Sequence, residues 1–248
     1  SECSRKQKLQ EKLHRVFHQY GFEDIETPTF EYFEVFSKEV GTIPSRDLYK
    51  FFDREGNTLV LRPDFTPSVS RACATYFNPE KEVVSLCYTG NTFINNSSFR
   101  GRLKETTQMG VERMGDDSPE ADAEILAMTV ECLLATGLTE FQVSVGQVDY
   151  YKAIFAQTGL SQEEEEELRE LISQKNYFGV EELVKNKNMD KSLARVLSQL
   201  PQMFGSTEVL EKAKSLTDNP QALKAVARLE EIYELLKVYG YEKYVTFD

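Results

Sequence analysis

The stretch FINNSSFRGRLKETTQMGVERMG, residues 93–115, carries polar side chains whose spacing suits binding chemistry. Gln108 and Glu112 stand two positions either side of Gly110, and alternation along a strand would place all three on one face. A glycine inside a strand can mark close approach by a ligand, so this face suits a ligand platform. The loop before it, residues 95–98, carries no charge, so the stretch lacks the groups that a reaction would need.

The two histidines of the chain, His14 and His18, stand four residues apart. On a helix, this spacing could direct both rings at one metal ion. No third ligand is evident nearby in the sequence, so we interpret them as a surface or interface pair and expect no metal site. Glycine-rich nucleotide loops and the GxSxG elbow are also missing. We therefore expect neither a histidine-based catalytic triad nor a bound cofactor.

A sheet and several helices are needed to position these residues, and the first half of the sequence predicts both. Two apolar runs around the turn DREGN predict a β-hairpin at residues 47–63. Alternating or apolar runs predict further strands at three places: 83–93, 104–115 and 139–149. Helical spacing and capping residues predict three helices: 9–20, 66–77 and 118–137.

The two later strands of this half have an unusual polar face. In the strand at 139–149, Gln142, Ser144 and Gly146 share one face, as Gln108, Gly110 and Glu112 do in the strand before it. Small residues and amides leave room above the backbone, whereas a solvated face would normally carry Lys, Glu and Thr. The alternative interpretation is an ordinary sheet face exposed to water.

From about residue 150 onward the sequence is helical until KYVTF at its end. We predict a core at 1–151, an all-helical domain at 152–242 and the start of a returning core strand at 243–248. The glutamate run that follows Ser161 is typical of a solvated helix N-terminus rather than a metal site.

The composition narrows the class of protein. The net charge of −12 argues against non-specific nucleic-acid binding, which depends on basic residues. No run of about 18 apolar residues occurs, so no membrane span is expected. The four cysteines show no CxxC spacing, which favours reduced thiols and a cytoplasmic location.

Three stretches carry a resemblance to a known family. GFEDIETPTFEYFEVF resembles motif 1 of class II aminoacyl-tRNA synthetases, whose strand ends in a proline at the dimer interface; Pro28 stands at that place. LVLRPDFTPSVSR resembles the LRPEGT segment of histidyl-tRNA synthetases, and residues 93–115 resemble their motif 2. The resemblance covers most of residues 1–150. It implies an α+β fold, in which helices flank an antiparallel sheet and the helical half takes the place of the family's insertion domain.

The resemblance also implies a pocket for histidine. Asp64 and Thr66 match residues that face the α-amino group of the ligand. Gln108 matches a glutamine that contacts its polar backbone groups, and Glu112 matches a glutamate that accepts from the imidazole. Arg102 is a further possible contact. The alternative is that Thr66 only caps a helix, Asp64 only occupies a loop, and the two strand residues are only solvated.

Two residues of this stretch differ from motif 2 at positions that contact ATP in the family. The family has an arginine for the α-phosphate directly after the phenylalanine, and this chain has Ile94 there. The glutamate that helps to seat adenine is replaced by Asn96. Arg102 alone would leave the phosphates under-neutralised, so the resemblance implies that histidine activation is absent or very weak.

A synthetase-like chain without ATP chemistry resembles the family of regulatory subunits of ATP phosphoribosyltransferase, in histidine biosynthesis. That resemblance implies three partners: the short catalytic subunit, a second copy of the chain through motif 1, and L-histidine as the regulatory ligand. No tRNA would be bound. The alternatives are a histidine–tRNA ligase, or a histidine-binding module of unrelated role.

The resemblance to this family also bears on the C-terminal end of the sequence. After EKYVTFD, the family continues into a second histidine-contacting segment and motif 3, and neither occurs here. We expect this chain to be a fragment, with the C-terminal part of the core outside it.

Overall fold

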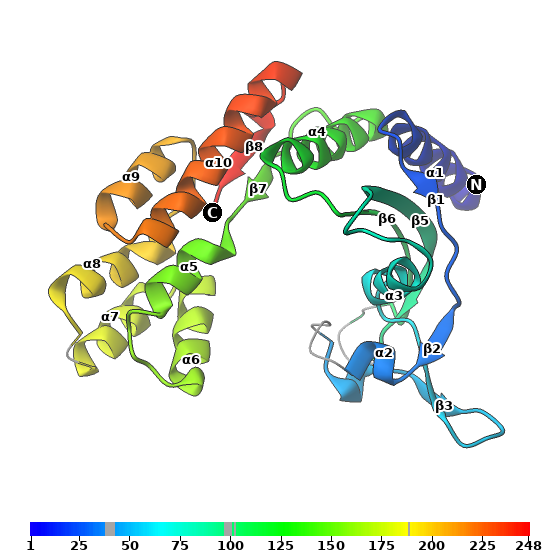
Figure 1. Ribbon diagram of the computed structural model, residues 1–248, viewed down its shortest axis with the longest axis horizontal. Coiled ribbons are helices and arrows are strands. Elements are labelled where there is room, and N and C mark those ends of the chain that lie inside the picture. The colour runs from blue at the N-terminus through cyan, green and yellow to red at the C-terminus, as the bar shows by residue number, and fades with distance from the viewer. Residues whose placement is uncertain (38–42, 97–100, 102, 188) are drawn as a thin grey trace. The chain divides into compact units, whose positions relative to one another are not determined.

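The computed structural model describes residues 1–37, 43–96, 101, 103–187 and 189–248. The chain forms two compact units, Ser1–Asp117 and Ser118–Asp248, shown in blue to green and in green to red in Figure 1. No helix in these described ranges is both long and apolar enough to cross a membrane.

The first unit begins with helix α1 (Glu2–Gln19), whose N-terminus is capped by the Ser1 side chain. The helix ends before Gly21, which adopts the positive φ of 77° that favours glycine. Strand β1 (Glu23–Asp24) follows at once. The apolar residues of the predicted helix turn inward near its end, where Val16 and Phe17 are buried.

The central sheet of this unit has the strand order β1, β5, β6. Strand β5 (Val84–Phe93) pairs in parallel with β1 and antiparallel with β6 (Glu105–Met114). Helix α3 (Thr66–Tyr76) packs on one face of β5, and α1 lies on the opposite face (Figure 1). The core on the α3 side is a set of six buried residues: Phe65, Val69, Cys73, Val84, Leu86 and Tyr88.

A second sheet has the order β2 (Phe30–Tyr32), β4 (Thr58–Leu61), β3 (Lys50–Phe52), and all its pairings are antiparallel. The predicted hairpin is confirmed as β3–β4, with Asp53 accepting backbone N–H bonds from Glu55 and Asn57 in its turn. The short helices α2 (Glu34–Ser37) and η1 (Ser45–Asp47) complete the unit.

The second unit is mainly helical. Helix α4 (Pro119–Thr136) starts at the Ser118 cap and ends at Gly137, as predicted. It packs against α10 (Pro220–Tyr239), the longest helix described. The other elements are α5 (Val148–Phe155), α6 (Gln162–Ser173), α7 (Tyr177–Asn186), α8 (Lys191–Gln199), η3 (Leu200–Gln202), α9 (Glu208–Leu216) and η4 (Glu242–Tyr244). Strands β7 (Val143–Val145) and β8 (Val245–Phe247) pair in parallel within this unit.

The α+β class predicted from the sequence is confirmed, and the sheet arrangement is more divided than expected. The described residues form three small sheets, and two of their pairings are parallel. The compact units divide after Asp117 because Ala123 and Ala127 of α4 belong to the core of the second unit. The division into a core at 1–151, a helical domain at 152–242 and a returning strand at 243–248 stays a prediction.

Candidate functional site

The predicted histidine contacts lie together where the start of α3 meets strand β6. The hydroxyl of Thr66 donates to Glu112 Oε1 at 2.6 Å, across a separation of 46 residues. The backbone N–H of Thr66 donates to Asp64 Oδ1 at 3.3 Å. Thr66 is thus the first residue of α3 and not its cap, and its side chain belongs to a polar cluster. Asp64 in turn holds the first turn of the helix.

Tyr88 occupies the middle of this cluster, although no sequence pattern singled it out. It is paired with Gly110 across the β5–β6 ladder, and directly opposed residues share one face of a sheet. A Cβ atom on Gly110 would come within 2.3 Å of Tyr88 Oη. The room predicted above Gly110 is therefore filled by the phenol ring. A glycine that faces a tyrosine across two pairable strands is the sequence signal that could have revealed it.

Gln108 completes the group, since its Nε2 donates to Tyr88 Oη at 3.3 Å. Four predicted ligand residues, Asp64, Thr66, Gln108 and Glu112, thus surround one tyrosine hydroxyl. All four are half-buried, so they are accessible and only partly solvated. The fifth, Arg102, lies outside the described residues.

The charges of the cluster favour a cationic ligand. Burial is the main cause that raises the pKa of Glu112, and the nearby charge of Asp64 adds to it, while the hydrogen bond from Thr66 opposes it. Burial and the charges of Glu112 and Asp64 also raise the pKa of Tyr88, so its hydroxyl stays neutral. A positively charged ligand group between the carboxylates would relieve their repulsion.

A stacked column of three side chains, Tyr88, Phe65 and Arg62, lies next to the cluster. The rings of Phe65 and Tyr88 stack with centroids 4.3 Å apart, and the Arg62 guanidinium lies 3.9 Å from the Phe65 ring centre on its other side. Gly90 makes this possible, because a Cβ there would come within 2.6 Å of Arg62 and 2.7 Å of Phe65. The column holds the tyrosine ring in one place.

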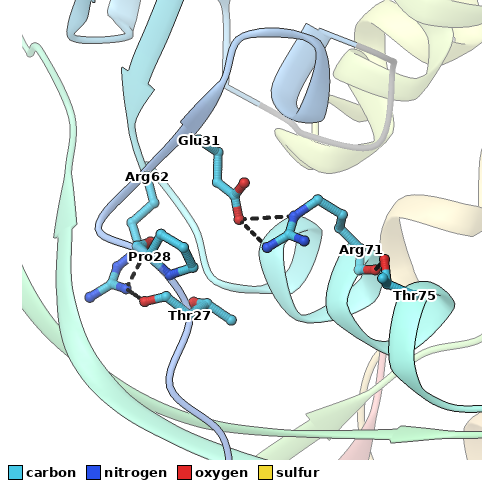
Figure 2. A network of polar contacts seen from close by, with 6 residues as sticks. All are labelled: Thr27, Pro28, Glu31, Arg62, Arg71 and Thr75. Carbon is cyan, nitrogen blue, oxygen red and sulfur yellow. Dashed lines mark hydrogen bonds and ion pairs between the residues drawn. The ribbon is translucent and has the colours of Figure 1, made fainter.

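Arg62 also fixes the segment that carries Pro28. Figure 2 shows its Nη1 donating to the Thr27 carbonyl at 2.9 Å and to the Pro28 carbonyl at 3.3 Å. Its Nε donates to the Asn91 carbonyl of β5 at 2.8 Å. Arg62 of the LRP stretch thus connects the segment before the β2–β4–β3 sheet to strand β5 of the central sheet.

A second pair in the same view joins the β2 strand to helix α3. The buried carboxylate of Glu31 accepts from Arg71 Nε at 3.1 Å and from its Nη2 at 2.8 Å (Figure 2). Two donors from one guanidinium fix its orientation as well as its position. The pair therefore ties the middle of α3 to strand β2.

Ile94 directly follows β5, at the predicted place of the missing ATP contact. Its N–H donates to the Lys104 carbonyl at 3.0 Å, which extends the β5–β6 pairing by one step. The Asn96 N–H donates to the Ile94 carbonyl at 2.9 Å. Residues 97–100, which complete the predicted loop, lie outside the described residues.

A different group could hold a metal on the opposite face of the sheet. The structure places Asp24 and Cys87 beside His14 and His18, with all four ligand atoms within 4.8 Å of one another. Asp24 and Cys87 are the candidate further ligands that were not evident in the sequence, and the expectation of no metal site stays a prediction. Asp24 comes from β1 and Cys87 from β5, so only the folded chain brings them together.

The chain matches known proteins along its whole length. The curated ATP phosphoribosyltransferase regulatory subunits of Acetivibrio thermocellus and Ruminiclostridium cellulolyticum are 40% and 38% identical to it, over 100% of this chain and 59% of each relative. The chain thus spans about 59% of the length of these curated relatives.

Solved structures agree with these matches. A crystal structure described as an ATP phosphoribosyltransferase regulatory subunit/histidyl-tRNA synthetase, from Bacillus halodurans C, is 32% identical and has a TM-score of 0.87. It covers 99% of this chain, which spans 64% of it. The histidyl-tRNA synthetase of Nostoc sp. PCC 7120 has a TM-score of 0.79 at 19% identity, over 100% of this chain and 58% of the synthetase, and so supports the fold alone. The family model for histidyl-tRNA synthetase matches residues 1–248, and the chain therefore belongs to the histidyl-tRNA synthetase family.

Proposed function

We propose that this chain is the synthetase-like part of a regulatory subunit of ATP phosphoribosyltransferase, and that it binds histidine without activating it. The observation that carries the proposal is the group of relatives with that name, 36% to 40% identical over the whole chain. The proposed role is to activate a short catalytic subunit and to transmit feedback inhibition by histidine.

Ile94 supports the absence of synthetase chemistry. Attack on the α-phosphate of ATP develops negative charge, and an isoleucine side chain offers no hydrogen bond or positive charge to it. Loss of one such contact costs about 3 to 4 kcal/mol of transition-state stabilisation in enzymes where it has been measured. The alignment of Ile94 with the missing arginine is part of the proposal.

The polar cluster around Tyr88 supports histidine as the regulatory ligand. In our assignment, Asp64 and Thr66 face the ligand ammonium group, Gln108 contacts its polar backbone groups, and Glu112 accepts from the imidazole N–H. Charge-assisted hydrogen bonds are the strong ones, so the acidic residues would supply most of the affinity. Tyr88 would add a neutral hydroxyl next to Gln108, with which it already shares a hydrogen bond.

Self-association through motif 1 is the second part of the proposal. Phe30, Tyr32 and Phe51 share one face of the β2–β4–β3 sheet and expose 49%, 52% and 36% of their surface, and the first two follow Pro28 closely in the sequence. Exposed aromatic side chains gathered on one small sheet are typical of a protein interface. A second copy of the chain would cover them, and the dimer would join the catalytic subunit.

The test uses the full-length protein with and without the short catalytic subunit. We expect no histidine-dependent ATP–pyrophosphate exchange, a rise in phosphoribosyltransferase activity when the two subunits are mixed, and loss of that activity as histidine is added. Exchange clearly above background would contradict the proposal. It would favour the alternative, a histidine–tRNA ligase, which the family membership and the retained pocket residues support. Charging of tRNA with histidine would establish that alternative.

A further inference from the structure

The second polar cluster of the first unit lies on the α1 face of the central sheet, away from the proposed histidine pocket. His14 and His18 project from the last two turns of α1. Asp24 and Cys87 are partners in the parallel ladder of β1 and β5, so they share one face of the sheet. Three separate elements thus deliver two imidazoles, one carboxylate and one thiol to a single point.

The distances show that the groups converge on one centre. His14 Nε2 lies 2.6 Å from Asp24 Oδ1, and His18 Nε2 lies 2.9 Å from Asp24 Oδ2. Cys87 Sγ lies 3.4 Å from Asp24 Oδ1. The two imidazole rings lie next to each other, with centroids 4.1 Å apart and planes tilted by 47°. Both rings therefore turn the same nitrogen atom toward the same carboxylate.

The contacts to Asp24 can be compared with the spacing in a tetrahedral metal site, and the remaining ligand-atom pairs lie within 4.8 Å of one another. Zinc bonds of about 2.0 to 2.3 Å place neighbouring ligand atoms roughly 3.3 to 3.7 Å apart. The Asp24–Cys87 distance already falls in that range at 3.4 Å, and the two His–Asp distances are shorter. Asp24 is exposed, so a shift of its carboxylate away from the two imidazoles would open the centre to an ion.

The site combines a rigid interior with an open entrance. Cys87 is fully buried, and the Ile25 N–H donates to its carbonyl at 2.9 Å, which fixes the Cys87 backbone in the sheet. The His14, His18 and Asp24 side chains are 40%, 46% and 58% exposed. A surface groove lined by His14 and Asp24 also carries Glu11, Glu26 and Arg62, and because its acidic residues outnumber the arginine, its net charge favours cations.

We propose that His14, His18, Asp24 and Cys87 form a zinc site that joins helix α1 to strands β1 and β5. Imidazole and thiolate ligands favour Zn²⁺ over Mg²⁺ or Ca²⁺, which prefer oxygen. Four protein ligands close the coordination sphere, so the role is structural and not catalytic. This site goes beyond the proposed regulatory function and does not depend on it.

Metal binding has to overcome one opposing effect. Burial, together with the neighbouring Asp24, raises the pKa of the Cys87 thiol to about 12, so the thiol is protonated in the metal-free chain. Zinc binds the thiolate and therefore releases a proton. Without metal, the same four groups form a hydrogen-bonded network, which is the competing interpretation.

The experiment is a titration of the full-length protein, reduced and stripped with a chelator, with Co²⁺ as a spectroscopic substitute for Zn²⁺. We expect saturation at one ion per chain, visible ligand-field absorption, and a near-ultraviolet sulfur-to-cobalt charge-transfer band. Added Zn²⁺ should displace the cobalt and raise the thermal midpoint, because it binds only the folded state.

Variants assign the ligands. Cys87→Ser should abolish the charge-transfer band, whereas Cys73→Ser, at a buried thiol of α3 outside the cluster, should retain it. His14→Gln should lower Zn²⁺ affinity by more than about tenfold, at least the loss that outer-shell changes cause. Lys8→Gln, an exposed change on the same helix, should leave the affinity unchanged.

Two results would overturn the proposal. One is the absence of a charge-transfer band in the unsubstituted protein. The other is a Zn²⁺ affinity that His14→Gln leaves unaltered, which would indicate surface binding elsewhere. If Cys87→Ser fails to fold by circular dichroism, the exposed His14→Gln variant decides the question alone.

Discussion

The two faces of the β1–β5–β6 sheet both carry polar clusters, and the clusters are built in opposite ways. On the α3 face, Glu112 and Gln108 lie beside a buried aromatic stack, so polar groups and core packing share the same residues. On the α1 face, His14, His18 and Asp24 are largely exposed, and only Cys87 reaches the interior. The α3 cluster is therefore coupled to the stability of the unit, and the α1 cluster is largely independent of it when no metal is bound.

Removal of the aromatic stack should have the largest effect. Phe65→Ala deletes a buried ring that packs against Tyr88 and Arg62, so we expect the free energy of unfolding to fall by about 3 to 5 kcal/mol. Tyr76→Ala, at a residue of the same unit that is 75% exposed, is the matched control and should cost little. Urea denaturation measures both. Equal losses would remove the contrast between a buried face and an exposed one.

The next effect concerns ligand binding. Glu112→Gln keeps the shape but removes the charge that would accept from the imidazole, so we expect histidine affinity to weaken by about 1.5 to 3 kcal/mol. Calorimetry on the full-length protein provides the measurement. Glu105→Gln, on the same strand and the opposite face, should bind histidine as the parent does. Unchanged affinity in Glu112→Gln would show that the imidazole contact is wrongly assigned.

Gly110→Ala tests whether the tyrosine fills the space above the glycine. The added methyl group would come within 2.3 Å of Tyr88 Oη, and such overpacking costs about 1 to 3 kcal/mol of stability. The cost should shrink when the same change is made in a Tyr88→Ala background, because the opposing ring is gone. A double-mutant cycle by thermal or urea unfolding measures this coupling. Strictly additive effects would show that the Tyr88 ring does not fill the space above Gly110.

The smallest effect is expected on the α1 face. In the presence of a chelator, His18→Gln removes one exposed pair with Asp24 and should change the free energy of unfolding by less than about 1 kcal/mol. Lys8→Gln on the same helix gives the baseline for an exposed change. A loss of several kcal/mol without metal would mean that the hydrogen-bonded network itself holds α1 in place.

The residues that could be predicted from the sequence share a simple property. Gln108, Gly110 and Glu112 alternate along one strand, so their common face follows from local geometry. Helix α4 could likewise be predicted from the Ser118 cap and the Gly137 stop, and the structure confirms both. In each case the information lies within a few consecutive residues.

The residues that the sequence did not reveal depend on pairings over long separations. Tyr88 reaches Gly110 only because β5 and β6 adopt one register, and Cys87 reaches Asp24 through a separation of 63 residues. The hydrophobic periodicity within one strand does not determine which residues of another strand it pairs with. The described strands divide into three small sheets for the same reason, because strand partners are chosen by tertiary packing.

The stacked column imposes a rule on how this sequence can vary. Gly90 lies against Arg62 and Phe65, and Gly110 lies against Tyr88, so each glycine is a space reserved for a particular large neighbour. A relative that gains a side chain at either position has to shorten the residue above it. In an alignment, the two glycines should therefore change together with the rings and the guanidinium that they accommodate, as two covarying groups of positions.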